Sequence, residues 1–255
     1  MQVAALTTLC NNKFLHFNST CAFQVHVGRG TQGFQLPTLQ KLTSLLFVGG
    51  EKLLDEVHPR HRLGAPFCHP ITTKTFLGNF VLAGREPTAT LDEEWFNRCV
   101  APSQTLRVEA QLRRIWQAKT VDEFCRMLDP REGNVAYSFA GLSPRERENA
   151  TDIPNSSGVG EEPKVAKPTI EFRQGDGNVV LDEKYPVAWI KTATSLVAWA
   201  IDVDEASFEE VIQETARNVP PSGAQEKLST FLKHVGVSDE AVVPMVNRAA
   251  SLNGA

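Results

Sequence analysis

The alternation of apolar and polar residues along residues 18–30, NSTCAFQVHVGRG, predicts a β-strand. Side chains of a strand point alternately to its two faces, so Gln24 and His26 share a polar face. The opposite face, which suits a hydrophobic core, carries Cys21, Phe23, Val25 and Val27. The run ends in Gly-Arg-Gly, where the backbone can turn sharply or let a ligand approach closely.

A second strand of the same character is predicted at residues 167–174, KPTIEFRQ, with Ile170 and Phe172 on its apolar face. Its polar face carries Thr169, Glu171 and Arg173. Laid side by side, the two strands would bring an imidazole, a carboxylate and a guanidinium onto one surface. Such a trio can hold a magnesium ion through the carboxylate and a phosphate through the guanidinium. Two half-buried strands whose polar faces are simply solvated are the alternative interpretation.

Leucines at helical spacing predict a helix that begins near Pro37 and buries a leucine stripe. Gly49 and Gly50 are expected to bend it, and His58-Pro59 to close it. Thr120 and Glu123 form a capping-box pattern that opens a further short helix. The other predicted helices are residues 91–100, 105–118, 186–201, a segment from 204 onward, 222–234 and 238–252.

Residues 58–70 combine histidines, a cysteine and several prolines, and are predicted to form an irregular loop. Their spacing matches no standard structural zinc site. Arg60 and Arg62 are candidates there for holding an anionic substrate, with solvent exposure as the simpler interpretation.

Composition adds limits to this picture. The 255 residues are 42% hydrophobic and 22% charged, which is typical of a globular protein, and the net charge of −4 gives no reason to expect a nucleic-acid partner. No apolar stretch approaches the ~20 residues that span a bilayer, so no membrane partner is expected. The five cysteines have no Cys-x-x-Cys spacing, which favours a reduced, cytoplasmic protein.

Four segments resemble, in order, a known family. TCAFQVHVG resembles the TCGxHVHVG strand of the fungal-type amidoligases, which belong to the glutamine synthetase and carboxylate-amine ligase superfamily. LPTLQKLTSLL with LLDEVHPRHRLG is similar to that family's helix and its HPxHR segment. NVAYSFAGL resembles the AYNFxNL segment, and KPTIEFRQ resembles TIEFRQHxG.

The resemblance implies an ATP- and magnesium-dependent ligase that joins a carboxylate to an amine through an acyl phosphate. It implies that Glu171 is a magnesium ligand, that Arg173 holds the transferring phosphate, and that His26 touches nucleotide phosphate or substrate. Gln24, at the position of the family's first histidine in this strand, is expected to help bind the nucleotide with Arg173 and His26. The expected partners are a small-molecule or peptide carboxylate and an amine.

Three departures from the family pattern favour a second hypothesis. Gln24 replaces a histidine, Gly175 stands where the family usually has another, and residues 1–17 contain no carboxylate, although the family opens with a strand of paired glutamates. The chain is therefore expected to be either a truncated ligase or a non-catalytic remnant. Such a remnant would keep the fold and bind a nucleotide or acidic ligand.

The resemblance also implies the fold: α+β, with a mostly antiparallel, glutamine synthetase-like sheet and packed helices. The helical pattern after residue 203 adds a C-terminal helical tail. Residues 1–17 are expected to be poorly defined, 18–142 to form the amidoligase-like region, and 143–168 to be a flexible insertion. Residues 169–202 supply the second site strand and an apolar helix, and 203–255 the tail.

Overall fold

The computed structural model describes residues 22–78, 96, 105–130, 133–143, 168–177, 184–218 and 224–253. The predicted N-terminal segment lies outside these residues. So do almost all of the predicted insertion and, apart from Phe96, the predicted helix at 91–100. The described chain is α+β and mostly helical, with a small antiparallel sheet. The expected class and strand orientation are therefore confirmed.

Among the described residues, three strands form the sheet, in the order β1 (Ala22–Gly28), β3 (Thr169–Asp176) and β2 (Tyr137–Ser138). β3 lies in the centre and is antiparallel to both neighbours. Along β1 the predicted alternation holds, because Val25 is buried while Gln24 and His26 are exposed. The two segments singled out by their pattern are thus adjacent strands with their polar residues on a common face.

The register between β1 and β3 shifts where Gln24 lies. Phe23 faces Gly175 and Val25 faces Phe172, so two residues of β3, Arg173 and Gln174, oppose one residue of β1. This arrangement is a β-bulge in the central strand, a feature that re-aims side chains next to it.

Helix α2 (Leu36–Leu45) continues through a π-helical turn (Leu46–Gly50) into α3 (Glu51–Asp55). The turn needs a glycine, because Gly49 has a φ of 147°, a conformation that L side chains rarely adopt. The predicted bend at the glycine pair is confirmed. The leucine stripe is core as predicted, with exposed fractions of 0–1% for Leu39, Leu42, Leu45 and Leu46.

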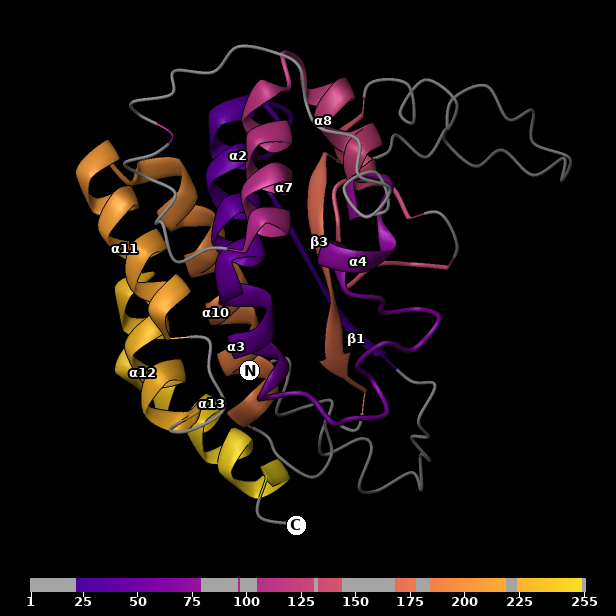
Figure 1. Cartoon of the computed structure of the whole chain (residues 1–255). Helices are drawn as coiled ribbons and strands as arrows, with labels where there is room; N and C mark the ends of the chain where they lie inside the picture. The colour runs from indigo at the N-terminus through magenta and orange to yellow at the C-terminus, as the bar shows by residue number, and fades with distance from the viewer. Residues whose placement is uncertain are drawn as a thin grey trace, which may run out of the picture.

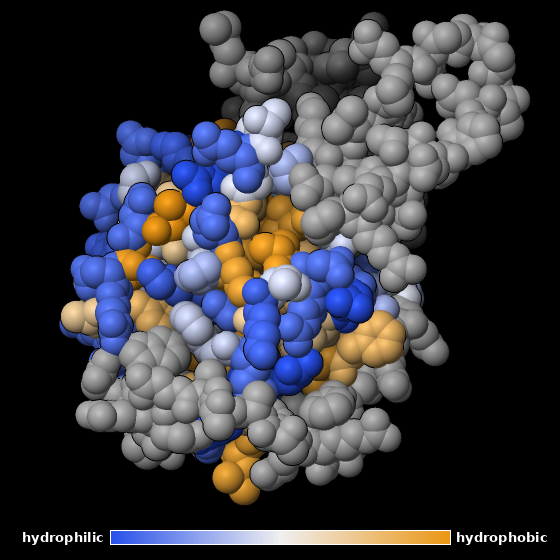
Figure 2. Space-filling view, turned by 90° about the horizontal axis from the view of Figure 1, so that it is seen from above, coloured by the Kyte–Doolittle hydropathy of each residue, from blue (hydrophilic) through white to orange (hydrophobic). Residues whose placement is uncertain are grey.

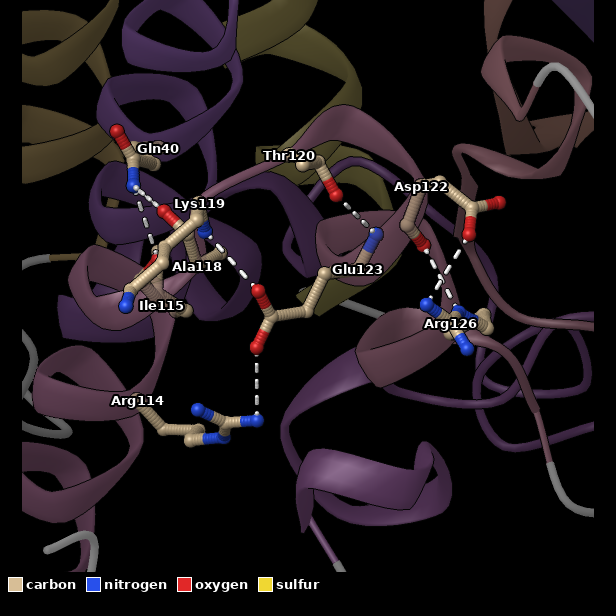
Figure 3. A network of polar contacts seen from close by, with 9 residues as sticks. All are labelled: Gln40, Arg114, Ile115, Ala118, Lys119, Thr120, Asp122, Glu123 and Arg126. Carbon is tan, nitrogen blue, oxygen red and sulfur yellow. Dashed lines mark hydrogen bonds and ion pairs between the residues drawn. The ribbon is translucent and has the colours of Figure 1, made fainter. Parts of the chain in front are cut away.

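A network of side-chain hydrogen bonds and ion pairs fixes the junction of α7 (Leu106–Gln117) and α8 (Val121–Leu128), as Figure 3 shows. Thr120 caps α8 by accepting from the backbone N–H of Glu123, as the capping-box pattern predicts. The Glu123 carboxylate accepts from the Lys119 backbone N–H and pairs with Arg114 at 3.0 Å. Gln40 of α2 donates to the carbonyl of Ile115 near the end of α7. These hydrogen bonds and this ion pair therefore position α8 relative to α7, and α7 relative to α2.

Helix α10 (Lys184–Asp202) packs against β1, β3 and α2, behind the apolar face of the sheet. Its Trp189 meets the Phe172 ring edge-on, with the ring centroids 6.1 Å apart. The apolar helix predicted at residues 186–201 is therefore confirmed, and it packs on the sheet.

The helices of the C-terminal region follow α10. They are α11 (Glu205–Arg217), α12 (Ala224–His234) and α13 (Asp239–Asn253). Figure 1 shows them on the side of α2, α3 and α10 that faces away from β3. α13 packs on α10, α12 on α3, and α11 on α2, so this region extends the helical layer.

Two short helices complete the described fold, α4 (Ile71–Lys74) and a 3₁₀ turn (Ala140–Leu142).

At the end of the molecule seen in Figure 2, hydrophilic residues surround a smaller hydrophobic area. In the ranges described, no helix is long and apolar enough to cross a membrane.

Candidate functional site

The predicted site residues meet in a row across the sheet. In the strand register, Glu171 of β3 lies opposite His26 of β1 on one side and opposite Ser138 of β2 on the other. Cross-strand partners lie on the same face of a sheet. The central carboxylate is therefore flanked by an imidazole and a hydroxyl, each from a different strand.

His26 contacts both polar residues at the start of β3. Its Nε2 lies 3.5 Å from Oε1 of Glu171, and its Nδ1 lies 3.2 Å from Oγ1 of Thr169. The His26 side chain is 52% exposed, whereas that of Glu171 is only 11% exposed. The imidazole is thus held by the sheet yet open to solvent, where an incoming ligand can reach it.

Arg173 supplies the positive charge next to the buried carboxylate. Its Nη2 donates to Oε2 of Glu171 at 2.6 Å, and the two residues are two positions apart on one strand face. A short charge-assisted hydrogen bond of this kind offsets the cost of burying a carboxylate. The predicted trio of imidazole, carboxylate and guanidinium is therefore brought together.

A pocket of about 310 Å³ opens beside this trio. Among the described residues its lining comes from all three strands and the 3₁₀ turn: His26, Ser138, Gly141, Thr169 and Glu171. Gln24 is exposed on β1 but is not in this lining. Two of the predicted site residues line the pocket and Arg173 is paired with one of them, while Gln24 lies outside this lining, opposite Arg173 across the bulge.

The donor set of this pocket can be compared with what magnesium requires. Magnesium commonly uses one or two carboxylates together with substrate phosphates and water. Glu171 can supply one carboxylate, whose oxygen atoms are hard donors. This carboxylate is already paired with the Arg173 guanidinium. Within the described ranges, no group of three or more His, Cys, Asp or Glu side chains could hold a metal ion. The described residues of the pocket therefore supply one carboxylate, Glu171, as a candidate metal ligand, and no set of ligands for several ions.

Comparisons with protein-family models, curated proteins and solved structures give no significant match for this chain.

The structure explains why residue 175 is a glycine, which the sequence motif does not reveal. A Cβ atom at this position would overlap the backbone carbonyl oxygen of Phe23 on β1. Close approach of the two strands beside the bulge therefore requires glycine. A histidine there, as in the resembling family, would need this part of the sheet to move.

The prediction of solvent exposure is confirmed for Arg60 and wrong for Arg62. Arg62 is fully buried, and its Nη2 donates to the backbone carbonyl of Arg173 at 2.7 Å. Sequence reasoning missed this role, because the loop's prolines and charges indicated only an irregular surface segment. The Phe67 ring, whose centroid lies 4.5 Å from the guanidinium carbon, packs on Arg62, a contact that appears only in the folded loop.

Further polar groups lie behind the sheet, on the helical side. Gln174 donates to Oδ1 of Asp55 at 2.6 Å, where α3 ends. Burial, together with the nearby Glu51 and Glu56 carboxylates, raises the pKa of Asp55 to about 8. A neutral Asp55 carboxyl therefore prevails on the helical side of the bulge at neutral pH.

His58 lies deep in this region, with Nδ1 3.1 Å from the hydroxyl of Tyr185 and its ring against Trp189. Burial, with the guanidiniums of Arg248 and Arg62 nearby, holds the pKa of His58 well below its usual range. The imidazole is neutral here, so this histidine of the HPxHR segment is part of the interior. His26 is the histidine of the pocket.

Proposed function

We propose that the polar face of the sheet binds the phosphoryl groups of magnesium-bound ATP, and that the chain is an amidoligase-like protein. A carboxylate would take the γ-phosphoryl group, releasing ADP. The nitrogen of an amine would then attack the acyl phosphate, expelling phosphate and losing a proton to form an amide. The observation that supports this proposal best is the cross-strand trio of His26, Glu171 and Arg173 beside a pocket.

Each residue of the trio would have a distinct task. Arg173 can fork onto phosphoryl oxygens, as guanidinium groups do, and offset charge that develops during transfer. Glu171 would hold the magnesium ion, whose chemical contribution is to neutralise charge between phosphoryl groups. His26 can donate a hydrogen bond to a phosphate or to substrate from the pocket wall. The finer expectation, a glutamine synthetase-like arrangement of the sheet, belongs to the same proposal.

A binding experiment tests the role of Arg173. Wild-type protein is titrated calorimetrically with ATP in excess magnesium, alongside Arg173→Gln and the matched control Arg113→Gln. Arg113 pairs with Glu109 on α7 at 2.9 Å, so the control also breaks an arginine-carboxylate ion pair, but away from the pocket. We expect Arg173→Gln to weaken binding at least about tenfold, the usual scale for losing a charge-assisted bond. Equal affinities for the two variants would contradict the assignment.

Non-catalytic binding is the second candidate, and a specific observation favours it. Among the described residues, Glu171 is the only carboxylate that lines the pocket. Ligases that transfer phosphoryl groups commonly use more than one metal ligand. A protein with this face would retain affinity for a nucleotide or an acidic ligand and would act through binding.

Hydroxylamine distinguishes the two candidates, because it traps an acyl phosphate as a hydroxamate. The protein is incubated with magnesium, ATP, hydroxylamine and a panel of carboxylic acids that includes amino acids and short peptides. Hydroxamate and ADP formed together, and lost in Arg173→Gln, would support the ligase. Binding of ATP without either product across the panel would favour the binding protein.

A further inference from the structure

The two bulge residues of β3, Arg173 and Gln174, form hydrogen bonds with three different parts of the chain. The backbone N–H of Arg173 donates to the carbonyl of Ala136 at 2.8 Å, just before β2. The carbonyl of Arg173 accepts from Arg62 at 2.7 Å, and the side chain of Gln174 reaches Asp55 at 2.6 Å. Both backbone groups of Arg173 and the next side chain are thus engaged, while the Arg173 guanidinium stays on the opposite, polar face with Glu171.

Arg62 is itself held in place. Its exposed fraction is 0%, and the ring of Phe67 lies 4.5 Å from its guanidinium carbon. Its backbone N–H donates to the carbonyl of Pro59 at 2.8 Å, which closes a turn in the loop. A buried guanidinium that is packed and hydrogen-bonded is a rigid donor, because little side-chain freedom remains to be lost.

We infer that Arg62 is a positioning residue for the site: by donating to the Arg173 carbonyl from the interior, it holds the bulge that turns the Arg173 side chain onto Glu171. This inference rests on the proposed function for its consequence in ligand binding. Its structural part, that Arg62 stabilises the bulge, can be measured without any ligand.

The physical reason lies in the local strand geometry. At a bulge the regular ladder is interrupted, so its backbone groups need partners from elsewhere. Arg62 supplies a charged donor to one of these carbonyls. Without this donor the strand can relax at residues 173–174, and the Arg173 guanidinium then moves relative to Glu171. Misplacement of a site group by about 1 Å is enough to impair its function severely.

Arg62→Lys tests the inference while keeping the positive charge. Arg248→Lys is the matched control, since Arg248 is also an arginine inside the helical layer, with its side chain only 11% exposed, packed 3.9 Å over the Tyr185 ring and bonded to the Val57 carbonyl and Asp176. We expect Arg62→Lys to weaken magnesium-ATP binding by about tenfold, and the control to change it less than about twofold. Equal effects of the two substitutions would overturn the inference.

A double substitution separates positioning from general loss of structure. If Arg62 acts through Arg173, then Arg62→Lys should weaken binding in the wild-type background and have no further effect in Arg173→Gln. A fold-change of the same size in both backgrounds would show that Arg62 does not act through Arg173.

Hydrogen exchange at the Arg173 backbone amide supplies the readout that needs no ligand. We expect Arg62→Lys to speed exchange at this amide at least about tenfold relative to Val25, and Arg248→Lys to leave that ratio unchanged. If exchange is faster in Arg62→Lys but the wild type does not bind ATP, the proposed function is refuted, while stabilisation of the bulge by Arg62 is supported. Unchanged exchange in folded Arg62→Lys would overturn the inference. If Arg62→Lys does not fold, Phe67→Leu replaces it, because it removes the ring that packs on Arg62 and leaves the guanidinium in place. We then expect the same faster exchange at the Arg173 amide relative to Val25, and unchanged exchange would overturn the inference.

Discussion

The carboxylate of Glu171 accepts a 2.6 Å hydrogen bond from the Arg173 guanidinium, two residues further along the same strand. The pair joins the group proposed to hold magnesium to the group proposed to hold phosphate. Because the Glu171 side chain is only 11% exposed, Arg173 is also the partner that makes burial of its charge tolerable. Binding of magnesium-ATP would exchange this internal pair for contacts with the ligand, so affinity depends on how easily the pair opens.

Gly175→Ala should destabilise the protein, because the added Cβ would overlap the Phe23 carbonyl oxygen. We expect a loss of about 1–3 kcal/mol in the free energy of unfolding, measured by urea denaturation. Gly28→Ala is the control, since its Cβ would come no closer than 3.0 Å to the Thr169 methyl group and 3.3 Å to the Pro168 carbonyl oxygen. A smaller loss for Gly175→Ala than for Gly28→Ala would be inconsistent with the close strand approach described above.

Asp55→Asn should remove part of the pH dependence of stability. The pKa of Asp55 is raised from 3.8 to about 8, so the folded state holds an extra proton between these values. The resulting stabilisation is complete below about pH 4 and disappears as the pH rises through about 8. An asparagine can still accept from Gln174 and cannot ionise, so the variant's free energy of unfolding should fall less between pH 5 and 8, by on the order of 2 kcal/mol.

Urea denaturation at pH 5, 6.5 and 8 measures this effect. A smaller decline should persist in Asp55→Asn, because burial also raises the pKa of Glu51 to about 7. Glu109→Gln on α7 serves as the control and should follow the wild-type curve. Parallel curves for wild type and Asp55→Asn would show that Asp55 ionises normally in the folded protein.

Gln24→His restores the family's histidine at an exposed position outside the pocket lining. We therefore expect the affinity for magnesium-ATP to change less than about twofold. Calorimetric titration of the variant in excess magnesium measures it. Tighter binding by tenfold or more would instead place residue 24 among the ligand's direct contacts.

Local patterns predicted the parts of the fold that depend on neighbouring residues. Alternation gave the two faces of β1, and leucine spacing gave the buried side of α2, because burial of one face is encoded at a period of two or 3.6 residues. The cap at Thr120 follows equally from residues three positions apart. The meeting of His26 with Glu171 was predicted only as a consequence of pairing the two strands.

The rest depends on contacts between residues far apart in the chain. At the bulge, the Arg173 carbonyl accepts from Arg62, which lies 111 residues earlier in the chain, and no periodicity signals this contact. The burial of Arg62 likewise depends on where the loop packs. Its charge alone favoured the surface, since arginines are mostly exposed unless paired. The reason for Gly175 appears only once β1 lies beside β3.

The most direct test of the central claim is calorimetric titration with ATP, with and without magnesium, of the wild type and Glu171→Ala. Urea denaturation of both proteins in parallel checks that the variant remains folded. The account predicts magnesium-dependent binding by the wild type and its loss in a folded Glu171→Ala protein. Full magnesium-dependent binding by Glu171→Ala would contradict the proposed site.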